Sequence, residues 1–229
     1  MPPALVIFDM IGTTIDGSDR VAALFAAVAA EAGLTASDVQ LQRVRGLNKA
    51  DAFLALARAG GRSGAVADSL AAGMHARFRA GLERDLALHP PREIAGARQT
   101  LEWLAVREIP AALTSGLDRE FVDAVLAHLG WTRALVATAV CGGDVERGRP
   151  APDLIFEAMR RTGVTDAAAV VAVGDTVADL EAAAAAGVGA GVGVLSGAGR
   201  QESLQAAPHA AILPSVADLP AWLASRATR

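Results

Sequence analysis

Short apolar runs alternate with helical patterns along this chain, and this alternation restricts the possible folds more than any other feature. The first run, residues 4–8, ends directly at Asp9 and is followed by Gly12, which is typical of a strand buried on both faces. Four further strands are predicted at residues 110–114, 134–141, 169–173 and 188–194. Helices are predicted among them at residues 119–129, 153–161 and 177–186. The pattern indicates an α/β fold with a parallel sheet.

Residues 15–88 interrupt this alternation. Amphipathic helices are predicted there at about 20–32, 36–43, 49–59 and 66–86, with no strand between them. Two prolines follow at residues 90–91, and proline restricts its own backbone and that of the preceding residue. We therefore expect a core domain of residues 1–14 and 89–229 and a helical cap domain of residues 15–88, with hinges near residues 15 and 89.

Composition restricts the partners and the compartment. The chain of 229 residues has 21 basic and 25 acidic residues and a net charge of −4, which argues against binding to nucleic acid or an anionic membrane. No apolar stretch approaches the roughly 20 residues needed to cross a bilayer. The single cysteine, Cys141, excludes an internal disulfide, and the N-terminus shows no signal-peptide pattern. We expect a cytoplasmic protein that acts on a small molecule.

Polar residues gather at the carboxyl ends of the predicted strands, where open parallel sheets bind their ligands. Asp9 and Asp175 are carboxylates at two such ends, and we expect them to share Mg²⁺, which prefers oxygen ligands. Thr114 and the backbone N–H groups of Ser115 and Gly116 are expected to bind a phosphate group. Because these strand ends meet at one edge of the sheet, the five residues should converge in space.

Two further side chains extend this predicted site. Arg149 precedes a predicted helix and is expected to neutralise phosphoryl oxygens and the charge that develops during transfer. Asp9 would then attack phosphorus and form an aspartyl-phosphate. Asp179 lies one helical turn after Asp175 and is a secondary candidate, which either orients the metal site through water or lies on an exposed helix face.

At these residues the chain resembles the haloacid dehalogenase superfamily of hydrolases, whose four motifs occur here in the same order. Residues 8–14 resemble the nucleophile loop, residues 113–115 the second motif, Arg149 the basic third motif and residues 173–179 the metal-binding fourth. The resemblance implies a Rossmann-like, doubly wound parallel sheet with an inserted helical cap, and Mg²⁺ as cofactor. It also implies a phosphate-binding position at Met10 and a backbone carbonyl for the metal from Ile11.

Two departures from the superfamily pattern indicate one branch of it. Most members carry a second aspartate two residues after the nucleophile, which protonates the leaving oxygen, and this chain has Ile11 there. Loss of such an acid costs about 10²–10⁴-fold in rate with an alkoxide leaving group. The third motif is usually lysine and is Arg149 here. Both features resemble phosphonoacetaldehyde hydrolase and its phosphonatase-like relatives.

Lys49 is the one lysine among the 21 basic residues. A lysine amine can lose its proton and attack a carbonyl, which an arginine guanidinium does not do. In the phosphonatase branch a cap lysine forms a Schiff base with the substrate aldehyde, and residues 46–49 resemble the segment that carries it. The protonated imine withdraws electrons when phosphorus moves to Asp9, so the carbon leaves as an enamine and Ile11 need not be an acid.

The surroundings of Lys49 are predicted to lower its pKa. Asn48 has the pattern of a helix N-cap, which places Lys49 at the positive end of the helix dipole. Arg43 and Arg45 add positive charge, and partial burial beneath the cap disfavours the ammonium form. Arg45 is also expected to bind a carboxylate of the substrate.

The match to the phosphonatase pattern is incomplete. Arg45 stands where that branch has a methionine, Ala52 where it has a histidine, and Leu117 where it has an aromatic residue. We predict an enzyme that cleaves the C–P bond of phosphonoacetaldehyde or of a different or larger carbonyl phosphonate. The alternatives are a phosphatase of small phosphomonoesters such as phosphoglycolate or sugar phosphates, and a catalytically weak metabolite-binding protein. Related enzymes pair through cap helices, so the resemblance allows a homodimer that forms through the cap helices of this chain.

Overall fold

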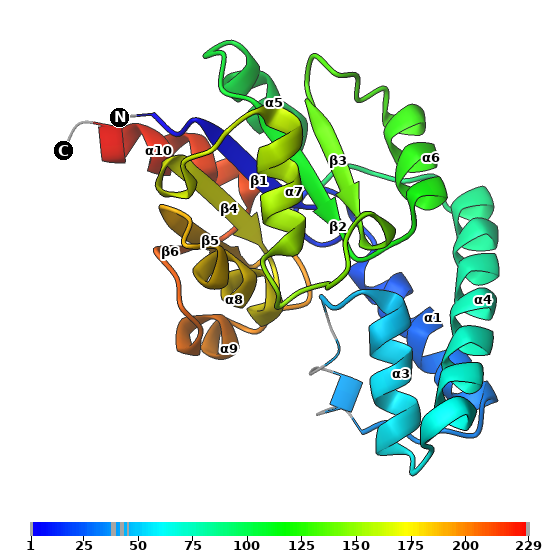
Figure 1. Ribbon diagram of the computed structural model, residues 1–229. Helices are drawn as coiled ribbons and strands as arrows, with labels where there is room; N and C mark the ends of the chain where they lie inside the picture. The colour runs from blue at the N-terminus through cyan, green and yellow to red at the C-terminus, as the bar shows by residue number, and fades with distance from the viewer. Residues whose placement is uncertain (1, 38–39, 42–43, 45, 228–229) are drawn as a thin grey trace.

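The computed structural model describes residues 2–37, 40–41, 44 and 46–227 (Figure 1). Its centre is a parallel sheet with the strand order β3-β2-β1-β4-β5-β6. The strands are β1 Leu5–Asp9, β2 Ala111–Ser115, β3 Thr138–Cys141, β4 Val170–Gly174, β5 Ala190–Val194 and β6 Ala211–Leu213. All five predicted strands are confirmed, although β3 starts four residues later because residues 132–136 form a turn. The edge strand β6 was not predicted, because its three half-buried residues are too short to show a pattern.

Helices cover both faces of the sheet, which confirms the doubly wound α/β fold. On one face the strand residues Val6, Phe8 and Leu113 pack with α5 (Ala97–Ala105), α6 (Arg119–Leu129) and α10 (Leu219–Ala227). On the other face Leu5 and Ile7 pack with α7 (Asp153–Thr162) and α8 (Val177–Ala186). Successive side chains of a strand point to opposite faces, so a strand buried on both faces is apolar throughout. The short helix α9 (Gln201–Ala206) packs on α8.

In the described part of the chain between β1 and α5, three helices form a separate bundle, called the helical bundle below. They are α1 (Ser18–Glu31), α3 (Lys49–Ala59) and α4 (Gly64–Leu88), and they lie beside the carboxyl end of β2 (Figure 1). Their own hydrophobic cluster is centred on Phe25, Phe53 and Phe78, with ring centroids 4.3–6.1 Å apart. The predicted helices at 20–32, 49–59 and 66–86 are thereby confirmed within two residues. The predicted helix at 36–43 lies partly outside the described residues.

The longest helix, α4, has 25 residues and buries small and apolar side chains such as Ala67 and Met74 against the other two helices. Its remaining surface carries acidic and basic residues. None of the helices in the described part of the chain is long and apolar enough to cross a membrane.

Two neighbouring segments connect the helical bundle to the sheet. Ile15 and Glu93 form an antiparallel bridge, and Ile94 donates its backbone N–H to the carbonyl of Thr14 at 3.0 Å. The backbone N–H of Asp16 donates to the carbonyl of Arg92 at 2.9 Å. The bridge lies close to both predicted hinge positions, so the two connections are held together where the bundle leaves the sheet.

Candidate active site

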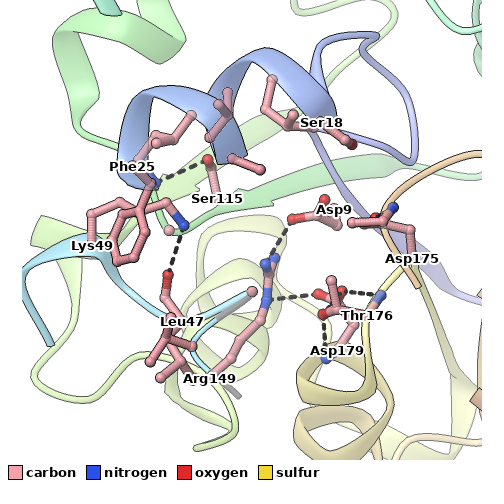
Figure 2. A pocket seen from close by; sticks show the side chains of 18 of the residues that line it. Asp9, Ser18, Phe25, Leu47, Lys49, Ser115, Arg149, Asp175, Thr176 and Asp179 are labelled. Carbon is pink, nitrogen blue, oxygen red and sulfur yellow. Dashed lines mark hydrogen bonds and ion pairs between the residues drawn. The ribbon is translucent and has the colours of Figure 1, made fainter. Parts of the chain in front are cut away.

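A cavity lies between the carboxyl edge of the sheet and the helical bundle (Figure 2). Its empty volume is about 800 Å³, including solvent at its mouth. The sheet side contributes mostly polar residues, which are Asp9, Ser115, Gly116, Arg149, Asp175, Thr176 and Asp179. The pairing of Asp9 with Thr114 and of Phe8 with Val173 aligns the ends of three strands at this edge. The structure therefore brings Asp9, Asp175, Ser115 and Gly116 together as predicted, with Thr114 beside Asp9 in the neighbouring strand, and Arg149 lines the same cavity.

Three buried carboxylates meet at this edge. Asp9, Asp175 and Asp179 each place one oxygen within 4.8 Å of the others. Burial and the neighbouring charge of Asp179 raise the pKa of Asp9 to about 6, although Arg149 opposes this rise. Burial and the charge of Asp9 raise the pKa of Asp175 well above its usual value. Since Asp179 is buried, the alternative of an exposed helix face for this residue was wrong.

Arg149 forms ion pairs with two members of this acidic cluster. Its Nη1 lies 2.6 Å from Oδ1 of Asp9, and its Nε lies 2.9 Å from Oδ1 of Asp179. Its Nη2 donates to the hydroxyl of Thr114 at 2.6 Å. Arg149 as a whole residue is 6% exposed, so solvent screens these contacts little. Arg149 thereby positions the predicted nucleophile and neutralises part of the acidic charge.

Asp175 is held by loops that come from distant parts of the sequence. Its Oδ2 accepts the backbone N–H of Ala198 at 2.6 Å, and its Oδ1 accepts the hydroxyl of Thr13 at 3.4 Å. Gly12 has a φ of 99°, and a Cβ there would lie 2.5 Å from Oδ2 of Asp175. Glycine is therefore required for the nucleophile loop to approach the carboxylate. Sequence reasoning missed both Thr13 and Ala198. Thr13 lies in the Gly-Thr-Thr run after Asp9, which is a signal that could have found it, whereas no signal in the sequence indicates Ala198.

Asp179 is fixed by the start of its own helix. Thr176 caps α8, and its backbone N–H and hydroxyl both donate to Oδ2 of Asp179, at 3.0 and 2.5 Å. The other oxygen of Asp179 thus remains with Arg149. This reciprocal cap was not predicted, although threonine followed three residues later by an acid is its usual signature.

The acidic cluster can hold a metal ion. Its donors are carboxylate oxygens, which suit hard cations such as Mg²⁺. Among the described lining residues of the sheet side, Arg149 is the one basic side chain beside three carboxylates, and the pKa values of Asp9 and Asp175 are raised. A bound cation would offset this excess of negative charge.

The phosphate-binding candidates divide into two groups. Ser115 and Gly116 line the cavity, and the Ser115 hydroxyl accepts the backbone N–H of Leu117 at 3.1 Å. Thr114 is not among the residues that line this cavity; its hydroxyl accepts from Arg149 and donates to the carbonyl of Phe8 at 3.4 Å. The Thr114 hydroxyl thus holds Arg149, and its contact with phosphate stays a prediction.

Met10 has its side chain fully buried in the core. Its carbonyl accepts the backbone N–H groups of Thr14 and Ile15 at 2.9 and 2.8 Å. The prediction that Met10 binds phosphate therefore concerns its backbone N–H alone.

Lys49 is the first residue of α3 and lines the cavity from the bundle side. Its Nζ donates to the carbonyl of Leu47 at 3.3 Å and lies 6.0 Å from the ring centroid of Phe25. Burial, followed by the charge of Arg149, lowers the pKa of Lys49 to about 8, although Asp9 opposes this effect. The predicted lowering is confirmed. Arg43 and Arg45, to which part of it was ascribed, lie outside the described residues, as does the expected carboxylate contact of Arg45.

Asn48 docks the start of α3 onto the sheet loops. Asn48 is the N-cap residue of α3, as predicted, but its side chain makes no capping hydrogen bond, and its Nδ2 donates to the carbonyl of Gly142 at 3.4 Å. A Cβ on Gly142 would lie 2.8 Å from Oδ1 of Asn48, and one on Gly148 would lie 2.7 Å from its Cβ. The backbone N–H of Lys49 donates to the carbonyl of Gly116 at 3.2 Å. The loops thus fix the position of Lys49 relative to the sheet.

Ile11 lines the cavity two residues after Asp9 and brings no proton donor to it. Leu117 also lines the cavity, whereas Ala52 is fully buried within the helical bundle. Cys141 lies outside the cavity lining, and burial raises its pKa to about 12. This agrees with the expectation that Cys141 is a buried thiol and not a nucleophile.

Comparison with known proteins identifies a family model of haloacid dehalogenase-like hydrolases that matches residues 3–187. A phosphonoacetaldehyde hydrolase of Bordetella avium is 30% identical over 185 residues, which cover 77% of this chain and 66% of the relative. A phosphoglycolate phosphatase of Pseudomonas savastanoi is 30% identical over 189 residues, covering 80% of this chain and 66% of the relative. The chain spans about a third to two thirds of the length of the phosphonoacetaldehyde hydrolases it matches.

A solved structure shares the fold over almost the whole chain. The crystal structure of a hydrolase from Pseudomonas syringae superposes with a TM-score of 0.85 and 23% sequence identity. The superposition covers 96% of this chain and 97% of the other. The arrangement of sheet and helical bundle is thus shared with a known hydrolase structure.

Proposed function

The chain belongs to the haloacid dehalogenase-like hydrolases, and on this premise we propose that it is a Mg²⁺-dependent, phosphonatase-like enzyme that cleaves the C–P bond of a carbonyl phosphonate. One observation carries the proposal. Asp9 and Lys49, the single lysine, line the same cavity, and Ile11 occupies the position from which an acid would protonate an oxygen leaving group. The similarity to a phosphonoacetaldehyde hydrolase supports the same chemistry.

The first step joins the substrate to Lys49. The neutral amine attacks the carbonyl carbon, water leaves, and a protonated imine forms. With a pKa of about 8, Lys49 supplies far more neutral amine at neutral pH than an ordinary lysine. The contact of its backbone N–H with Gly116 holds the amine beside the loop proposed to bind the phosphonate.

The second step transfers the phosphoryl group. The Asp9 carboxylate attacks phosphorus, the electron pair of the C–P bond moves to carbon, and the imine nitrogen accepts the displaced electrons. The products are an aspartyl-phosphate and an enamine, so no acid is needed at Ile11. The enamine then takes a proton on carbon, and water hydrolyses the imine and the aspartyl-phosphate, which restores both side chains.

The remaining polar residues position these groups. The backbone N–H groups of Ser115, Gly116 and Met10 are proposed to bind phosphonate oxygens, and Arg149, held by Thr114, orients Asp9. Asp9, Asp175 and the backbone carbonyl of Ile11 would hold the metal, with Asp179 as a supporting carboxylate. The metal would supply positive charge against the phosphoryl oxygens.

The cavity lies between the sheet and the helical bundle, so movement of the bundle relative to the sheet would admit substrate. We propose that residues 1–14 and 89–229 act as a core and residues 15–88 as a cap that moves relative to it. The bridge between Ile15 and Glu93 would act as the hinge.

The direct test is to incubate the protein and Mg²⁺ with phosphonoacetaldehyde or phosphonopyruvate, with and without borohydride. We expect phosphate release without borohydride, and with it a reduced adduct located on Lys49 by peptide mass spectrometry. The Lys49→Arg variant keeps the positive charge and should lose both signals. If neither substrate releases phosphate and no adduct forms, the proposal is wrong.

A phosphatase acting on small phosphomonoesters is the second candidate, because the acidic cluster and Arg149 suit phosphoryl transfer and a relative is named phosphoglycolate phosphatase. Turnover of phosphoglycolate that survives Lys49→Arg would favour it.

A further inference from the structure

The two sides of the cavity differ in chemistry, and the difference bears on the substrate. Beyond the polar sheet side, α1 and the segment before α3 contribute apolar side chains, which are Val21, Ala22, Phe25, Leu41, Val44 and Leu47. Ile11 and Leu117 add two more from the sheet loops. On the bundle side, Ser18 and Lys49 are the two polar side chains among the described lining residues.

Neither polar group serves the apolar part of the cavity. Ser18 lies at the acidic end, where a Cβ on Gly12 would be 2.5 Å from both the Ser18 hydroxyl and Oδ2 of Asp175 (Figure 2). Lys49 is committed to the substrate carbonyl in the proposed mechanism. A substituent on that carbonyl, pointing away from the phosphonate, would therefore meet the apolar wall.

The wall has a defined shape near Lys49. The Phe25 ring lies 6.0 Å from Nζ of Lys49, and it stacks on Phe53 with ring centroids 4.3 Å apart. Phe25 is 6% exposed, and Val44 is also buried. Aromatic rings packed in this way have little freedom to move away, so the space beside Lys49 is already formed.

We propose that the substrate is a 2-oxoalkylphosphonate whose carbonyl bears an apolar chain, and that the apolar wall formed by α1 and the segment before α3 binds this chain. This proposal rests on the proposed function and specifies its substrate class. The reaction is R–CO–CH₂–PO₃²⁻ plus water to R–CO–CH₃ plus HPO₄²⁻, so that only the C–P bond of the substrate is lost. The carbon formed as the enamine becomes the methyl group of a ketone.

The smallest carbonyl phosphonate would make few contacts with the apolar wall. Phosphonoacetaldehyde has hydrogen as its substituent and would leave the apolar side chains in contact with water. Each methylene group transferred from water to an apolar surface favours binding about fourfold. A carboxylate substituent, as in phosphonopyruvate, would lose part of its hydration against the apolar side chains of this wall.

The test compares ketones of increasing length, because aldehydes and ketones differ in intrinsic reactivity. With 2-oxopropyl-, 2-oxobutyl- and 2-oxopentylphosphonate we expect kcat/KM for phosphate release to rise about fourfold per methylene group. A constant or falling kcat/KM, or a preference for phosphonopyruvate over 2-oxopropylphosphonate, would overturn the inference. Cleavage of phosphonoacetaldehyde with no cleavage of any ketone would overturn the inference and leave the proposed function intact.

A matched pair of variants locates the binding surface. Ala22 lines the cavity, whereas Ala23, on the same helix, is exposed. Ala22→Leu should reduce the preference for 2-oxopentyl- over 2-oxopropylphosphonate by about tenfold, and Ala23→Leu should keep the wild-type preference. An unchanged preference in Ala22→Leu would overturn the assignment of the wall.

Binding provides a readout that does not depend on turnover. Alkylphosphonates lack the carbonyl and cannot form an imine, so calorimetry with propyl-, butyl- and pentylphosphonate reports the apolar contact alone. We expect Kd to fall about fourfold per methylene group, in the wild type and in Lys49→Ala. Equal Kd values across the series would refute the apolar site, whereas absence of any adduct at Lys49 would refute the proposed function.

Discussion

The proposed chemistry depends most on whether the Lys49 amine is protonated. A fall in the pKa from 10.5 to about 8 raises the neutral fraction at pH 7 from about 0.03% to about 9%, roughly 300-fold. Because the neutral amine attacks the carbonyl, the rate of imine formation should rise about tenfold per pH unit below the pKa and level off above pH 8. An ordinary lysine would show no plateau before pH 10.

The single lysine makes this prediction easy to measure. The metal-free protein is labelled briefly with acetic anhydride between pH 6 and 10.5, and peptide mass spectrometry separates Lys49 from the N-terminal amine. The shape of the curve gives the pKa, so slow access of the reagent does not affect it, and free Nα-acetyllysine amide serves as the control. A Lys49 curve that follows the free lysine up to pH 10 would refute the reasoning.

Two variants test the cause of the shift. The charge of Arg149 lowers the pKa of Lys49 and the charge of Asp9 raises it. Arg149→Gln should therefore move the midpoint to higher pH, and Asp9→Asn should move it to lower pH. A general loosening of the cavity would hydrate the amine and move both midpoints upward, so opposite shifts distinguish local electrostatics from loss of structure.

Three further predictions concern individual residues. Asp9→Asn should lower phosphate release by at least about 10³-fold while borohydride still traps substrate on Lys49, because imine formation does not use the carboxylate; loss of trapping as well would contradict separate steps. Ile11→Asp restores an acid near the leaving group and should raise phosphoglycolate hydrolysis by about 10²-fold or more, and an unchanged rate would show that the missing acid does not limit this activity. Gly142→Ala places a Cβ 2.8 Å from Oδ1 of Asn48, whereas Gly143 has open space around it. The Gly142 variant should therefore raise KM several-fold and the Gly143→Ala control should not; equal KM values would mean that the contact with Asn48 does not position the start of α3.

Features that depend on residues close together in the sequence were predicted, and features that depend on residues far apart in the sequence were missed. Strands β1, β2 and β4 were predicted closely because their fully buried residues form continuous apolar runs. The three-residue edge strand β6 gives no such signal and depends on its neighbour β5 for backbone partners. The same limit applied to Asn48, which is the predicted N-cap residue of α3 but whose side-chain contact with Gly142, 94 residues away, has no signal in the local sequence.

The sequence by itself determined the alternation of five strands with helices, the helical insertion and the residue types at the strand ends, because apolar periodicity and the position of polar residues are local properties. It also indicated the unusual pair of Lys49 and Ile11, which carries the proposal of C–P bond cleavage. Only the tertiary structure decided that Asp179 joins the acidic cluster, that Thr114 holds Arg149 and that the bundle side of the cavity is apolar. These features depend on contacts between residues far apart in the chain, where burial and distance set both the charge of a group and its partners.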